Sequence, residues 1–67
     1  MSDPRFPHVD VQLGGADGNA FAVLGKVRNA LQSGGATRVE IEEFVAEATA
    51  GDYDHLIQTA MRWVNVY

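Results

Sequence analysis

The chain alternates apolar and polar side chains near its start, a pattern that is typical of a strand. Val9, Val11 and Leu13 are apolar, and the residues between them are polar. Successive side chains of a strand point to opposite faces, so this alternation predicts a strand with one buried face. We expect the strand to begin at His8 and to end at the glycine-rich segment 14–19.

A first amphipathic helix is predicted from Ala20 to about Ser33, because apolar residues recur there at steps of three and four. Asn19 or Asp17 can cap its free N–H groups. The pair Gly34-Gly35 supplies the left-handed residue that commonly ends a helix. Within this helix Gly25 costs about 1 kcal/mol relative to alanine. Close packing of another element against its bare backbone is the favoured reason for it, and ligand contact is the alternative.

Two further helices follow. The second is predicted to open at Thr37, because Thr37 and Glu40 have the spacing of a capping box. Gly51 is expected to end it, and Asp52 to cap the third helix. The core-facing positions of these two helices are Ile41, Phe44, Val45, Ala48, Tyr53, Leu56, Ile57, Ala60, Met61 and Val64.

The tail changes to a period of two, which predicts a short final strand. Trp63, Asn65 and Tyr67 then share the face opposite two valines, and the aromatics are left outside. Aromatic side chains are enriched in interface cores, so these three residues are candidates for a homo-oligomer interface. The alternative is a covering loop formed by Phe6-Pro7.

The order of elements predicts an α+β fold, a small β-α-α-α-β domain. Its three helices would pack on a two-stranded sheet made from the first and last segments. A two-stranded sheet is marginal in water, so self-association is expected to extend it. Residues 1–7 carry two prolines and are expected to be a loose leader before a single domain at 8–67.

Composition narrows the function classes. The chain has 67 residues with nine Asp and Glu against five Lys and Arg, a formal net charge of −4, and no cysteine. Such a small domain needs support, and without disulfides self-association is the expected source. The negative charge opposes DNA and anionic membranes. With no long apolar run or secretory signal, a cytoplasmic protein is expected.

The residues of the chain offer little for catalysis. His8 and His55 lie in unrelated segments without ligand-like spacing, so no metal is expected. Ser2 and Ser33 lack a nucleophile motif. The sequence therefore predicts a protein that is not an enzyme and has no cofactor.

The segment 14–19 is the candidate ligand site, because glycines before a helix N-terminus expose backbone N–H groups to an anion. It matches neither phosphate-loop pattern, and a purely structural capping turn is the alternative. Basic side chains from several copies could complete a pocket around it. The predicted ligand-binding residues are Asp17, Gly18, Asn19, Phe21, Arg28 and Arg62.

The segments DGNAFA at 17–22, GDYDHL at 51–56 and MRWV at 61–64 resemble a family of small, mostly uncharacterised proteins of phages and mobile elements. The resemblance covers roughly residues 9–67. It implies a binding or blocking role, including counter-defence by trapping a phosphorylated, cyclic nucleotide signal. The alternative is a protein-interaction module that regulates a host or phage protein through Trp63, Tyr67 or the acidic face of the second helix.

Overall fold

The predicted order of elements is confirmed. A computed structural model describes residues 4–13 and 19–67 of the chain. The elements, in chain order, are β1 (Phe6–Val11), α1 (Ala20–Ser33), α2 (Arg38–Ala48), α3 (Tyr53–Trp63) and β2 (Val64–Val66). The fold is a small α+β domain with three helices and one two-stranded sheet.

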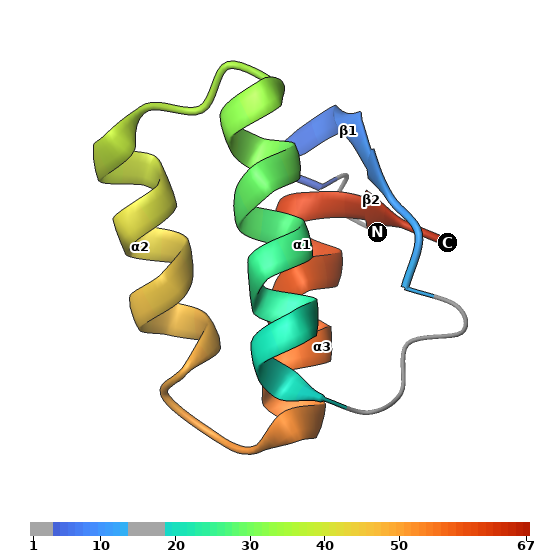
Figure 1. Ribbon diagram of the computed structural model, residues 1–67, viewed down its shortest axis with the longest axis vertical. Helices are drawn as coiled ribbons and strands as arrows, with labels where there is room; N and C mark the ends of the chain where they lie inside the picture. Colours follow the sequence, from blue (N-terminus) through green and yellow to red (C-terminus); the bar gives the residue numbers. More distant parts are fainter. Residues whose placement is uncertain (1–3, 14–18) are drawn as a thin grey trace.

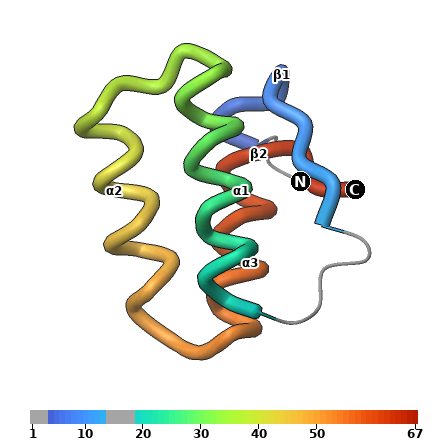
Figure 2. Tube along the Cα trace, viewed as in Figure 1, coloured from blue at the N-terminus to red at the C-terminus, as the bar shows by residue number. Residues whose placement is uncertain are grey.

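The helices lie in antiparallel succession beside the sheet. Figure 2 shows α1 and α2 running in opposite directions, joined by a short turn, and α3 returning behind α1. α1 contacts α2, α3 and β1, whereas β2 continues directly from α3. The two strands lie at one edge of the molecule, on the far side of α1 from α2 (Figure 1). α1 is therefore the central element of the fold.

The two strands pair in parallel, with Phe6 opposite Val64 and Val11 opposite Val66. Parallel strands need a long crossover, which the three helices provide. The strand β1 begins at Phe6, two residues before the predicted start, so Phe6 belongs to the sheet and not to a loose leader. The register is irregular between Phe6 and Asp10, and this irregular stretch accommodates Pro7, which cannot donate a ladder hydrogen bond.

Local capping signals place the helix ends. The Asn19 side chain accepts hydrogen bonds from the backbone N–H groups of Phe21 (2.9 Å) and Ala22 (3.4 Å) at the start of α1. Gly35, with φ of 94°, is the left-handed residue after that helix. The Asp52 carboxylate accepts from His55 N–H at 2.9 Å to cap α3. These three predictions are confirmed.

The predicted capping box at the start of α2 is also confirmed. The Thr37 hydroxyl accepts from Glu40 N–H at 3.1 Å, and the Glu40 carboxylate accepts from Thr37 N–H at 2.8 Å. The helix ends at Ala48, with Thr49 as its C-cap, so it stops earlier than the predicted end at Gly51. The Thr49 hydroxyl donates to the Val45 carbonyl at 2.7 Å, and the same carbonyl accepts from Thr49 N–H at 3.0 Å.

The core lies between the helices and the inner face of the sheet. Val23, Val27 and Leu31 of α1 are fully buried, as the helical spacing predicts, and Val9 and Val11 bury the inner face of β1. The remaining buried apolar residues are Phe6, Phe44, Ala48, Leu56, Ala60, Trp63 and Val64. Tyr53 and Met61, both predicted to face the core, are instead exposed.

Trp63 corrects the prediction for the tail. It is the last residue of α3 and not part of a strand, and only 4% of it is exposed. Its ring stacks on Phe6 with ring centroids 6.0 Å apart, and it meets Phe44 edge-on at 5.6 Å. The Arg5 guanidinium lies over it, 4.3 Å from the ring centroid. The predicted outward position of Trp63 is therefore wrong. Phe6 covers it, as the alternative expected, but from strand β1 and not from a loop.

Gly25 corrects a second prediction. Outside its own helical turn, a methyl group built on its Cα would meet no atom within 4 Å, so no element of the described structure packs against the bare backbone. The cost of this helical glycine is not offset within the described fold.

We predict that Phe6→Ala lowers the free energy of unfolding by about 3–5 kcal/mol, because it uncovers one face of Trp63 and leaves a cavity. Urea unfolding followed by fluorescence of Trp63, the single tryptophan, measures the change. Tyr67→Ala is the control, since Tyr67 is 65% exposed and its loss should cost below about 0.5 kcal/mol. Equal effects of the two substitutions would contradict the assigned packing of Phe6.

We predict that Gly25→Ala raises the free energy of unfolding by about 0.5–1 kcal/mol, because open space surrounds the site and alanine favours the helix. Gly35→Ala, a matched control, should lower it, since φ of 94° strains any residue with a Cβ. Chemical denaturation of both variants checks the signs. A destabilising Gly25→Ala would show that something contacts this face.

The capping box predicts a pH dependence. The hydrogen bond from Thr37 N–H lowers the pKa of the Glu40 carboxyl, with smaller contributions from the Thr37 hydroxyl and the Arg5 guanidinium. Because the pKa is lower in the folded state, this stabilisation is complete above the unfolded pKa and is lost as the pH falls through the folded one. The difference in unfolding free energy between the native chain and Glu40→Gln should therefore shrink on acidification, and a pH-independent difference would contradict this.

Candidate functional site

The described residues of the predicted ligand site lie in different parts of the structure. Asp17 and Gly18 lie outside the described residues. Asn19 caps α1, so its side-chain oxygen is already engaged with backbone N–H groups. Arg28 lies nine residues further along α1, about 13 Å at 1.5 Å per residue.

Arg62 lies near the end of α3 and is engaged with two neighbours. Its guanidinium donates to the Glu47 carboxylate at 3.2 Å and to the Thr59 hydroxyl at 3.4 Å. Phe21 stands in the first turn of α1 and is 85% exposed. The structure therefore does not bring Arg28, Arg62 and Phe21 together in one pocket.

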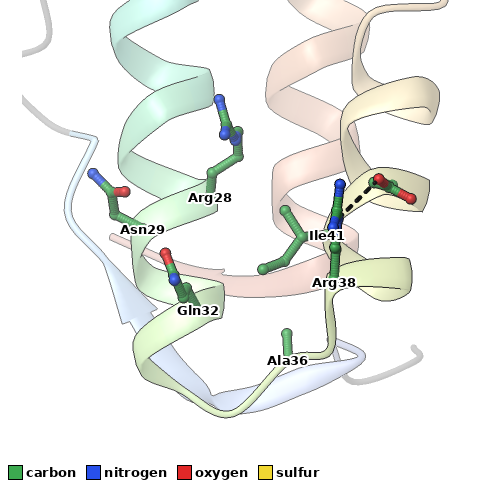
Figure 3. A pocket seen from close by; sticks show the side chains of 7 residues that line it. Arg28, Asn29, Gln32, Ala36, Arg38 and Ile41 are labelled. Atoms are coloured by element: carbon green, nitrogen blue, oxygen red, sulfur yellow. Dashed lines mark ion pairs between the residues drawn. The ribbon is translucent and has the colours of Figure 1, made fainter.

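A cavity of about 460 Å³ opens between the C-terminal half of α1 and the N-terminal half of α2. In Figure 3, Arg28 of α1 and Arg38 of α2 flank Ile41. The short turn between the two helices places their facing sides together, as short connections do in helical hairpins. The complete lining is Arg28, Asn29, Gln32, Ala36, Arg38, Ile41 and Glu42.

A second cavity of about 420 Å³ continues from the first along the same two helices. The two share Arg28, Ile41 and Glu42, and the second adds the apolar side chains of Val45 and Ala46. We call the two cavities together the α1–α2 groove. Arg28 lies where the polar part of the groove meets the apolar part.

Arg28 differs from the other cations of the chain in its contacts. Arg5, Arg38 and Arg62 each form an ion pair with a glutamate, and the Lys26 ammonium donates to the Gln12 carbonyl at 3.1 Å. Within residues 4–13 and 19–67, Arg28 has neither kind of partner. Its guanidinium can therefore bind an external ligand without first giving up an ion pair to a described residue.

The second cation of the groove is partly neutralised. Arg38 Nε lies 3.5 Å from a Glu42 carboxylate oxygen, one helical turn away. An exposed pair of this kind contributes little free energy, because both groups are well solvated. Arg38 can therefore exchange Glu42 for a stronger acceptor at small cost, and it keeps further N–H donors in any case.

The glutamates on the outer face of α2 are paired and not simply solvated. Arg5 lies 3.5 Å from Glu40 and 3.3 Å from Glu43. Glu42 and Glu47 pair with Arg38 and Arg62, respectively. The face thus carries less free negative charge than its composition indicates.

Both histidines bind backbone carbonyls near helix ends. His55 Nε2 lies 2.8 Å from the Glu47 carbonyl oxygen, and His8 Nε2 lies 3.1 Å from that of Gly34. Each ring contributes to helix termination, where carbonyls lack partners within the helix. No group of three potential metal-ligating side chains occurs among the described residues.

Only part of the lining of the groove could be predicted from the sequence. Arg28 was predicted as a ligand residue, but its neighbours Asn29, Gln32 and Arg38 were not. A usable signal is the i, i+4 spacing of Arg28 with Gln32, combined with the four-residue connection to α2, which makes the two helices neighbours.

Comparison with known proteins assigns neither a family to the chain nor a function to the groove. No helix in the described part of the chain is long and apolar enough to span a membrane. No protein-family model, curated protein or solved structure matches the chain. The resemblance to small phage and mobile-element proteins therefore stays a prediction.

Proposed function

We propose that this protein is a non-enzymatic binding protein that sequesters a small phosphorylated ligand in the α1–α2 groove. The observation that carries the proposal is the Arg28 guanidinium at the junction of the two cavities, which has no ion-pair partner among the residues that the structure describes. A planar guanidinium offers two parallel N–H donors, which match a phosphate oxygen pair. We thus place the site in the groove and not at the segment 14–19, which the sequence indicated.

The remaining lining suits an organic phosphate better than a bare anion. The carboxamides of Asn29 and Gln32 supply both donors and acceptors for a polar ring or sugar. Ile41, Val45 and Ala46 supply an apolar wall for a flat ring. A nucleotide carries these parts side by side, so we propose a nucleotide-type ligand, with a cyclic nucleotide signal as one candidate.

The cellular role that fits such binding is removal of a signal. A protein that only binds lowers the free concentration of its ligand in proportion to its own abundance. If the resemblance to phage proteins holds, sequestration of a defence signal would be counter-defence, and the site of action would be the cytoplasm. Binding groups without a positioned nucleophile in the described groove support sequestration over turnover.

The alternative, a protein-interaction module, has lost part of its support. Trp63 is buried, and the four glutamates of α2 are engaged in ion pairs. Tyr67 remains exposed and is the residue through which such a module would still dock.

We predict that adenosine 5′-monophosphate, 3′,5′-cyclic AMP or a cyclic dinucleotide raises the melting temperature of the chain. At a ligand concentration of 100 times Kd the stabilisation is about 2.7 kcal/mol, which corresponds to roughly 10–20 °C for a domain of this size. Arg28→Gln should weaken the affinity by about 10-fold or more, because it removes a charged hydrogen bond worth about 1.5–3 kcal/mol.

Lys26→Gln is the matched control, because it removes the same charge from the same helix but lies outside the groove. The affinity of this variant for the nucleotide should match that of the native chain. If no nucleotide raises the melting temperature at millimolar concentration, or if both substitutions weaken binding equally, the proposed site is wrong.

A further inference from the structure

A separate hollow of about 220 Å³ lies at the opposite end of the α1–α2 pair from Arg38. Its walls come from the first turns of α1, the end of α2 and the start of α3. The apolar side chains that shape it are those of Phe21, Leu24, Ala48, Tyr53 and Leu56. None of the residues that line the α1–α2 groove belongs to it.

Phe21 is one of the residues that line this hollow, and it is 85% exposed. Tyr53 of α3 also lines it and is 38% exposed. Burying a phenylalanine side chain is worth about 1.5–3 kcal/mol, and Phe21 contributes almost none of this to the single chain. An exposed aromatic beside an apolar hollow is the arrangement of an interface anchor and its pocket.

The charges at the hollow favour an apolar occupant. Asp52 is the charged residue of its lining, and its carboxylate is engaged in capping α3 through His55 N–H. No cation lines the hollow among the described residues. An anionic ligand would therefore find no charged partner there, whereas an uncharged aromatic side chain would need none.

We propose that the occupant is a second copy of this chain, with Phe21 of each protomer inserted into the hollow of the other. The anchor and the pocket lie side by side on one surface. A two-fold axis that passes between them therefore brings both reciprocal contacts into one closed interface, the commonest symmetry of soluble oligomers. The interface is distinct from Trp63 and Tyr67, the aromatics that the sequence indicated.

Such a dimer also supplies the support that a 67-residue chain lacks. It buries two exposed phenylalanines and two half-exposed tyrosines without disturbing the monomer core. Association of native chains stabilises them by mass action, so the melting temperature should rise with protein concentration. The α1–α2 groove of each protomer keeps its own lining.

The test measures mass by light scattering and sedimentation from micromolar to millimolar protein. We expect a dimer at high concentration, and Phe21→Ser and Tyr53→Ser should each weaken it by at least 10-fold. Tyr67→Ser is the control, because Tyr67 is an exposed aromatic outside the hollow and should leave the dimer unchanged. Far-UV circular dichroism confirms folding of Phe21→Ser, whose side chain takes no part in the core.

A native chain that stays monomeric throughout this range overturns the proposal. Loss of the dimer in Tyr67→Ser, with retention in Phe21→Ser, overturns it in favour of an interface at the β2 end. Nucleotide binding by Phe21→Ser in the melting assay tests the groove independently, so the two proposals fail or stand separately.

Discussion

The packing of the Trp63 indole against Phe6 and Phe44 joins the two ends of the chain to the helices. Phe6 begins the first strand, and Trp63 directly precedes the second. The parallel pairing of these strands spans most of the sequence, and such non-local contacts form only after a large loss of chain entropy. An apolar cluster at this junction offsets that loss, and Arg5 covers it while pairing with Glu40 and Glu43.

The helices could be predicted because their signals are local. Asn19, Thr37 and Asp52 act on N–H groups two or three residues away, so their effect is visible in sequence. The position of Trp63, in contrast, is not determined by its neighbours in the sequence alone. The valines after it favour a strand, but it ends α3, and its ring is buried against Phe6, more than fifty residues earlier. Gly25 shows the converse case, since a residue that predicts a tight contact has open space around it.

The proposed ligand-binding residues of the groove are equally hard to predict from the sequence. Arg28 and Arg62 look equivalent in sequence, but Arg62 is held by Glu47 whereas Arg28 has no such partner among the described residues. That distinction requires knowing which helix faces meet. Because the turn at 34–37 sets α1 against α2, an arginine from each helix reaches one cavity, and neither residue alone indicates a site.

We propose that the ligand binds at Arg28 in the groove and not at the segment 14–19. The most direct measurement is a nuclear magnetic resonance titration of isotope-labelled protein with the best-binding nucleotide, following side-chain and backbone N–H signals together. If the ligand binds in the groove, the largest shifts occur at the Arg28 Nε–H and at the side-chain amides of Asn29 and Gln32. Shifts centred on the backbone N–H groups of residues 14–19, with Arg28 unmoved, would contradict it.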